Sequence, residues 1–260
     1  MKIAVAGGTG LIGTMIVGAL TAGGETPIVL ARSAGVDLTT GEGLDARLAG
    51  VSTVIDVSNV TTYSARKSIE FFTAATRNLL AAGQRAGVGH HVVLSIVGID
   101  RVPFGYYVGK RRQEELALSG AVPVTVLRAT QFHEFAGQLL ARGGPVVPVP
   151  AGPSQPIAAR EVADALVAIC QAEPAGLLPD LGGPRAEYLP DMVRRVARAR
   201  GARRLIIAVK LPGAPGRALA AGALLPAGDG PRGKQTFSEW LDGRGGCQGR
   251  EGRKGREAPE

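Results

Sequence analysis

The amino-acid sequence predicts an α/β protein with a doubly wound parallel sheet and a small mixed lobe at the C-terminal end. Three observations predict this class. Short apolar runs typical of buried strands alternate with segments of helical spacing, and a glycine-rich turn joins the first run to the first helix. Beyond about Thr130 this alternation gives way to proline-rich and arginine-rich segments. We therefore expect a sheet domain over residues 1–130, an intertwined lobe over 131–242 and a disordered tail over 243–260.

Length and composition indicate a globular protein. The chain has 260 residues, of which 45% are hydrophobic and 20% charged, enough for one large or two small domains. No segment offers the roughly 18 uninterrupted apolar residues of a membrane span. A strand that begins at Lys2 leaves no room for a signal peptide, and two distant cysteines, Cys170 and Cys247, suggest no disulfide framework. A cytoplasmic protein with no membrane partner is expected.

The net charge of +8 is concentrated in one run. Seven basic residues and no acidic residue lie between Arg194 and Lys210. Aromatic residues make up only 4% of the chain and none lies in this run, so the run lacks a surface on which bases could stack. A solvated helix face that attracts anionic substrates is expected, and no nucleic-acid partner.

The first predicted strand, Lys2–Ala6, leads through a glycine-rich turn into the helical run Leu11–Leu20. Such a turn needs one glycine to reverse the chain, one to let the backbone approach a pyrophosphate and one to let helix pack on strand. The phosphates then lie on free N–H groups at the positive end of the helix. The pattern predicts a Rossmann-type dinucleotide site formed by Gly7, Gly8, Thr9, Gly10, Leu11, Ile12 and Gly13.

Arg32 stands just beyond the second predicted strand, Pro27–Ala31. An acidic residue at that place would hold the 2′-hydroxyl of the ribose, whereas an arginine accommodates a 2′-phosphate. The sequence thus favours NADP(H) over NAD(H), with Ser33 as a second donor. The alternative is that Arg32 is an ordinary surface residue.

The third apolar run, Val36–Leu38, follows Arg32 too closely for a parallel crossover, which takes a dozen residues or more. Either the second helix is missing or this strand is vestigial, so the sheet edge is expected to be trimmed. The strand Thr53–Val57 comes next, and Ser58 and Asn59 follow it at the carboxyl edge, where such sheets place ligands. We assign both to the cofactor site.

The remaining elements are expected from apolar spacing. His90 and His91 precede or begin the strand His91–Ile96 and have no partner at ligand spacing, so no metal site is predicted. The other expected helices and strands are a turn at Gly43–Leu48, helices at Ser64–Ala86, Val108–Leu118, Gln131–Ala141, Arg160–Ala172 and Leu189–Arg200, strands at Pro123–Leu127 and Leu205–Val209, a proline-rich crossing at Pro145–Pro156 and a docked turn at Ser238–Leu241.

A candidate catalytic group is formed by Tyr106 and Lys110, whose i, i+4 spacing places both on one helix face. An ammonium close to a phenol favours the phenolate and lowers its pKa, which makes the phenol usable in proton transfer. Ser95, at the end of the preceding strand, could bond the same substrate oxygen. The alternative is that Tyr106 packs on its loop and Lys110 is solvated.

These motifs resemble the short-chain dehydrogenase/reductase superfamily, in the extended and atypical branches that include NmrA-like proteins. The resemblance runs through at least Phe135 and is carried by Ala6–Gly13, Thr76–Ala82, Val92–Ser95, the pair Tyr106 and Lys110, and Leu127–Phe132. It implies that Tyr106 is the general acid/base, that Lys110 binds the nicotinamide ribose and tunes Tyr106, and that Ser95 orients the substrate carbonyl.

Three features depart from the family pattern: the missing second helix, a short gap between Ser95 and Tyr106, and Tyr107, which competes for the tyrosine role. The substrate pocket is expected to take Tyr107, Gln131, Phe132 and His133, although these could equally be core residues.

The leading hypothesis is an NADP(H)-dependent oxidoreductase acting on a small carbonyl or alcohol, and a homodimer is left open. A redox sensor that binds NADP(H) without turnover is the second hypothesis. Sugar-nucleotide epimerisation ranks last, because the C-terminal lobe looks too short for so large a substrate.

Overall fold

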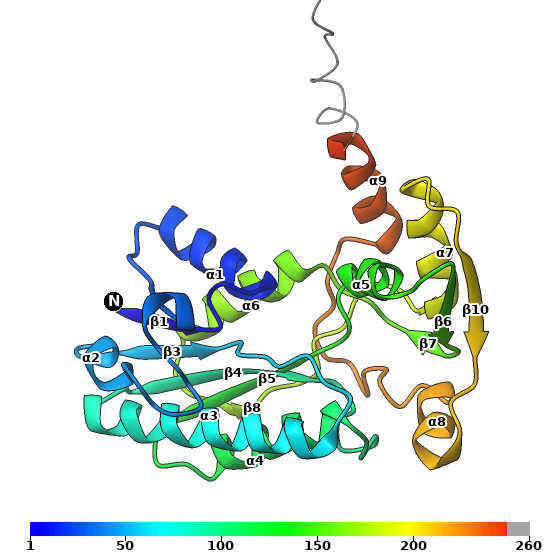
Figure 1. Ribbon diagram of the computed structural model, residues 1–260. Helices are drawn as coiled ribbons and strands as arrows, with labels where there is room; N and C mark the ends of the chain where they lie inside the picture. Colours follow the sequence, from blue (N-terminus) through cyan, green and yellow to red (C-terminus); the bar gives the residue numbers. More distant parts are fainter. Residues whose placement is uncertain (249–260) are drawn as a thin grey trace, which may run out of the picture.

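The computed structural model describes the backbone of residues 1–248 and the side chains as far as residue 243. It confirms the doubly wound parallel sheet (Figure 1). The strands lie in the order β2-β1-β3-β4-β5-β8, and every neighbouring pair is parallel. Their bounds are β1 Ile3–Ala6, β2 Ile28–Leu30, β3 Thr53–Asp56, β4 His90–Ile96, β5 Val124–Ala129 and β8 Gly176–Leu177.

Helices cover both faces of the sheet because successive side chains of a strand point to opposite sides. In β1, Ile3 and Val5 pack among residues of α1 and α6, whereas Ala4 and Ala6 pack among residues of α2 and α3. Helix α4 lies beside α3 on the second face (Figure 1). The bounds are α1 Leu11–Ala22, α2 Leu44–Leu48, α3 Ala65–Ala86, α4 Tyr106–Leu118 and α6 Ala159–Cys170.

The sheet edge beyond β2 is trimmed, as expected. The run Val36–Leu38 is not a strand. The chain instead makes a short 3-10 helix, η1 (Arg32–Ala34), and folds back with Val36 N donating to Ala31 O at 3.1 Å. Val36, Leu38 and residues of the five-residue α2 then fill the core beside β1. The connection between β2 and β3 therefore contains only a short 3-10 helix and the five-residue α2, and its apolar residues are buried against the sheet.

The rest of the chain forms a lobe beyond the carboxyl ends of the strands (Figure 1). Its core joins α5, α7, β6 and β10 to Phe237 and Trp240 of α9, where the docked turn is predicted. Strands β6 and β10 pair in parallel, and β7 pairs with β9 antiparallel. The bounds are α5 Glu134–Arg142, β6 Val146–Pro150, β7 Pro153–Ser154, β9 Glu187–Tyr188, α7 Leu189–Ala199, β10 Leu205–Val209, α8 Gly213–Ala220 and α9 Phe237–Gln248.

The segment after Thr130 also returns to the sheet, since α6 packs on α1 and β8 pairs with β5. Of the tail expected over 243–260, the first residues continue α9 as far as Gln248, and residues 249–260 lie outside the described part.

The arginine-rich run is partly structural. Arg195 bonds Glu187 and Ser238, which ties α7 to the start of α9. Arg204 donates to the carbonyls of Leu140 and Gly143 at the end of α5, the helix end that attracts cations.

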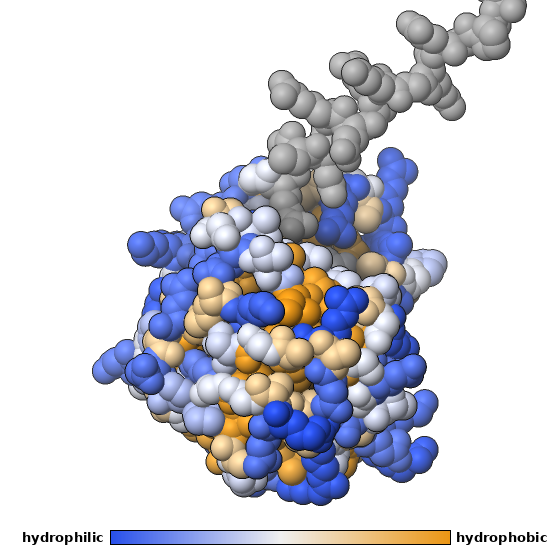
Figure 2. All heavy atoms as spheres, turned by 90° about the vertical axis from the view of Figure 1, so that its left-hand side faces the viewer, coloured by the Kyte–Doolittle hydropathy of each residue, from blue (hydrophilic) through white to orange (hydrophobic). Residues whose placement is uncertain are grey.

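The end of the molecule opposite the lobe shows hydrophilic residues around a central group of apolar ones (Figure 2). Within the described residues, no helix combines the length and the apolar character that crossing a bilayer requires. The same residues hold no cluster of three or more His, Cys, Asp or Glu suited to a metal ion.

Candidate functional site

The glycine-rich turn has the geometry that the sequence predicts. Gly7 has φ +78°, and a Cβ atom there would lie 2.8 Å from Val57 O. A Cβ atom on Gly13 would overlap Gly7 O and lie 2.6 Å from Gly8 Cα, so only glycine lets α1 pack this close to the turn. Thr9 and Gly10 are exposed, and no side chain caps the helix at Gly10. The N–H groups of the first turn of α1 are thus open to an anion.

Arg32 and Ser33 lie next to this turn, because Gly7 N donates to Leu30 O at the end of β2. Both are exposed at the start of η1. The nearby carboxylate of Asp37 accepts from Thr39 N at 2.7 Å and from Thr39 Oγ1 at 2.6 Å. These bonds hold the pKa of Asp37 below its ordinary value, so a negative charge remains beside Arg32.

The segment after β3 connects the glycine-rich turn to α4. Val57 and Ser58 pack against Gly7, and the next residue, Asn59, accepts a hydrogen bond of 2.8 Å from the Tyr106 hydroxyl. Ser58 N donates to Asp56 Oδ1 at 2.9 Å, whereas the buried Ser58 Oγ has no partner among the described residues. The turn and the tyrosine thus contact one short stretch of chain.

Helix α4 begins at Tyr106, two residues earlier than predicted. It is fixed against α3 by a bond of 2.8 Å from Ser68 Oγ to Tyr106 O, and a Cβ atom on Gly109 would overlap Ser68. Burial, then the neighbouring Tyr107 and Asp56, raises the pKa of Tyr106. Burial also raises the pKa of Tyr107 to about 12. The expected lowering of the Tyr106 pKa is therefore wrong for this arrangement, because desolvation of the phenolate dominates.

Lys110 is buried and points into the protein. Its ammonium donates to Leu94 O at 2.6 Å and to Gln113 Oε1, and it lies 4.9 Å from the centre of the Phe72 ring. Burial lowers the pKa of Lys110 to about 8, while Asp56 and then Glu114 act in the opposite direction. The solvated Lys110 that was the alternative is excluded.

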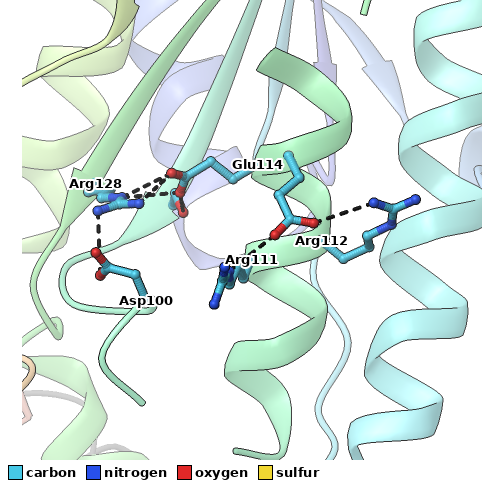
Figure 3. Close-up of polar contacts among 7 residues, drawn as sticks. Asp100, Arg111, Arg112, Glu114 and Arg128 are labelled. Carbon is cyan, nitrogen blue, oxygen red and sulfur yellow. Dashed lines mark hydrogen bonds and ion pairs between the residues drawn. The ribbon is translucent and has the colours of Figure 1, made fainter. Parts of the chain in front are cut away.

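Ser95 lies on the face of β4 that packs against α4, as does Val93 two residues earlier. Its hydroxyl is 2.7 Å from Glu114 Oε2 and donates to it. Glu114 in turn pairs with Arg128 of β5 at 2.6 Å, and Arg128 reaches Asp100 at 3.6 Å (Figure 3). The hydroxyl expected to orient a substrate carbonyl is therefore engaged in a buried ion-pair cluster.

The residues expected to line the substrate pocket have different surroundings in the structure. Gln131 Oε1 accepts from Ser154 Oγ at 3.2 Å, and the partly buried Phe132 packs on the sheet core. His133 is fully buried, donates Nε2–H to Gln235 O at 3.1 Å and packs against the rings of Phe237 and Trp240. His133 thus anchors α9, so the expectation that it lines a pocket is wrong. His133 is instead a core residue, which was the alternative expected from the sequence.

Several residues of the buried polar network were missed: Asp56, Gln113, Glu114 and Arg128. A signal existed for three of them. Gln113 and Glu114 follow Lys110 at i+3 and i+4, which places them on its helix face. Asp56 ends an otherwise apolar strand, where a charge needs a partner.

The comparisons with known proteins show the fold. No family model matches the chain, and no curated protein matches it either. MoeE5 in complex with UDP-glucose and NAD has 19% identity and a TM-score of 0.72, over 96% of this chain and 99% of its own. A short-chain dehydrogenase/reductase superfamily protein from Agrobacterium tumefaciens with bound NAD has 19% identity and a TM-score of 0.68, over 95% and 97%.

The UDP-glucose 4-epimerase of Thermus thermophilus, in complex with NAD, has 19% identity and a TM-score of 0.66, over 98% of this chain and 95% of its own. At such identities the likeness concerns the fold, and the NmrA-like character stays a prediction. The chain shares the Rossmann-like α/β fold of these proteins, one of which is a short-chain dehydrogenase/reductase superfamily protein.

Proposed function

We propose that the protein is a nicotinamide-dinucleotide-dependent oxidoreductase in which Tyr106 exchanges a proton with the substrate oxygen. One observation carries the proposal: the glycine-rich turn and the Tyr106 hydroxyl contact the same three-residue stretch, 57–59. A dinucleotide whose phosphates lie on α1 would reach Tyr106 along this stretch. The dinucleotide supplies hydride chemistry when bound, and the chain binds, orients and moves the proton.

The Tyr106 phenol is protonated near neutral pH and its hydroxyl donates in the structure, while burial, which raises its pKa, makes it a weaker acid than a solvated tyrosine. Its present acceptor, Asn59 Oδ1, is an amide carbonyl oxygen. A substrate carbonyl oxygen in that position would accept the same bond. The contact thus supports reduction of a carbonyl as the direction for which the hydroxyl is already prepared.

Tyr106→Phe should lower turnover by about 10²- to 10⁴-fold, the range typical of a lost general acid. The assay is oxidation of NADPH or NADH with a panel of aldehydes, ketones and quinones. Tyr107→Phe is the matched control and should keep most of the activity. If only Tyr107→Phe is inactive, Tyr107 takes the role. Tight dinucleotide binding without turnover would instead favour the redox sensor.

Arg32 supports NADP(H) as the preferred dinucleotide, although the proteins of similar fold named above hold NAD. Arg32→Glu should weaken NADP(H) binding by about tenfold or more, equal to about 1.4 kcal/mol, because a carboxylate repels a 2′-phosphate. Calorimetry with both dinucleotides measures this. Arg77→Glu, on exposed α3 surface, should leave the preference unchanged. Equal affinities of the original protein for both would remove the case for Arg32.

A second candidate is conversion of a sugar nucleotide. It is favoured by the likeness over nearly the whole chain to MoeE5 with UDP-glucose and NAD, and to TunA, an NAD-dependent NDP-hexosamine 5,6-dehydratase with a TM-score of 0.71. The argument that the lobe is too short for such a substrate is wrong, because the alignment with MoeE5 covers 99% of that chain. UDP-glucose and UDP-glucuronic acid therefore belong in the substrate panel.

A further inference from the structure

A buried chain of hydrogen bonds leads from β3 to Lys110. Asp56 Oδ2 accepts from Gln113 Nε2 at 2.8 Å, and Gln113 Oε1 accepts from the Lys110 ammonium. Asp56 and Gln113 are fully buried, and 4% of Lys110 is exposed. The direction of the Gln113 amide follows from chemistry, because an ammonium only donates and a carboxylate only accepts.

Lys110 keeps one donor for another oxygen. An ammonium has three N–H donors, and within the described part of the chain two acceptors are used, Leu94 O and Gln113 Oε1. Leu94 lies near the carboxyl end of β4, the edge at which parallel sheets bind ligands.

We propose that Gln113 and Asp56 are positioning residues for Lys110: they hold its ammonium in place, keep it charged, and leave one N–H for an oxygen of the bound dinucleotide. The contact with the dinucleotide rests on the proposed function. The position and the charge of the ammonium rest on hydrogen bonds within the protein and can be tested without any ligand.

The buried position of the Lys110 charge explains why the hydrogen bonds through Gln113 to Asp56 are needed. An isolated ammonium in this environment would lose its proton, because burial penalises the charged form. The charged groups that act on Lys110 are Asp56 from β3 and Glu114 from α4, and α3 contributes the Phe72 ring. Asp56 also acts on Tyr106 of α4 and on His91 of β4. The Glu114 carboxylate is already engaged by Arg128 and Ser95, so Asp56 is the anion whose hydrogen bonds lead to the lysine.

The direct test is a pH titration of the lysine side chains by NMR, with the Cε carbons labelled with carbon-13. The sequence has six lysines, and Lys110→Arg identifies the resonance of Lys110. Among the described lysines it is the buried one, and burial lowers its pKa to about 8, well separated from an ordinary lysine.

Asp56→Asn and Gln113→Met should each lower the pKa of Lys110 by about one unit, since the first removes the nearby negative charge and the second removes an acceptor. Asp45→Asn and Gln138→Met are the matched controls on exposed surface and should leave it unchanged. An unchanged Lys110 titration in both Asp56→Asn and Gln113→Met, with the fold intact by circular dichroism, would overturn the proposal.

Dinucleotide affinity measured against pH tests the ligand part. Affinity should fall as pH rises through the pKa of Lys110, because the neutral amine has lost its charge and a donor. In Asp56→Asn the fall should begin at lower pH. If the NMR titration shifts as expected but the original protein binds no dinucleotide at any pH, the positioning role of Gln113 and Asp56 is supported and the proposed function fails. An affinity profile that does not move with the Lys110 titration would overturn the ligand part alone.

Discussion

Gly13→Ala is expected to weaken binding of either pyridine dinucleotide by about 10- to 100-fold. The added Cβ atom would overlap Gly7 O and lie 2.6 Å from Gly8 Cα, so α1 and the turn must separate. That movement withdraws N–H groups from the phosphates, and one lost bond to a charged group is worth about 1.5–3 kcal/mol. Calorimetric titration with NADPH and NADH measures the change.

Gly18→Ala is the matched control on the same helix. A Cβ atom there meets no atom within 4 Å, and Gly18 is exposed. Alanine in a helix interior is favoured over glycine by about 0.5–1 kcal/mol, so this variant should unfold at slightly higher urea concentration with unchanged dinucleotide affinity. Equal dinucleotide affinities in the two variants would show that the turn does not hold the phosphates. Urea unfolding of Gly13→Ala separates lost binding from lost folding.

Glu114→Gln should lower the free energy of unfolding by about 3 kcal/mol, because it leaves the Arg128 guanidinium enclosed without its closest carboxylate. The Arg128 and Glu114 side chains are only 17% and 6% exposed, and their atoms approach to 2.6 Å. Asp100 still faces Arg128 at 3.6 Å, which holds the loss at the lower end of the range for a broken buried pair. Urea denaturation followed by circular dichroism provides the measurement.

Glu115→Gln, one residue further along α4, is the control. Glu115 pairs with Arg111 at 3.1 Å, but their side chains are 46% and 51% exposed. A solvated pair of this kind contributes about 0.2–1 kcal/mol at most, so the control should change little. A loss in Glu115→Gln equal to that in Glu114→Gln would contradict the importance of burial.

The double change of Glu114→Leu with Arg128→Met removes both charges together. It should cost less than the sum of its two single changes, because neither charge is left buried alone. A strictly additive loss would show that the two side chains act independently.

A helix or strand could be predicted from the sequence when its own residues carry a recognisable apolar pattern. Strands β1, β3, β4 and β5 are buried on both faces, so each is a continuous apolar run and was predicted within about two residues at either end. The two-residue strands β7, β8 and β9 are defined by their partners and have no pattern of their own. Helix α4 begins at Tyr106 because its N-terminal neighbour, Gly105, has φ +53°, which no spacing rule reveals.

The sequence by itself determined the layered α/β fold, the glycine-rich turn and the shared helix face of Tyr106 and Lys110, because these depend on backbone geometry and on residues close together in the chain. The tertiary structure decided which partner each buried polar group takes. Ser95 donates to Glu114, and Lys110 is linked through Gln113 to Asp56, which lies 57 residues from Gln113. A buried donor or acceptor must bond whatever group the packing of distant elements brings to it, and spacing along the chain does not record that choice.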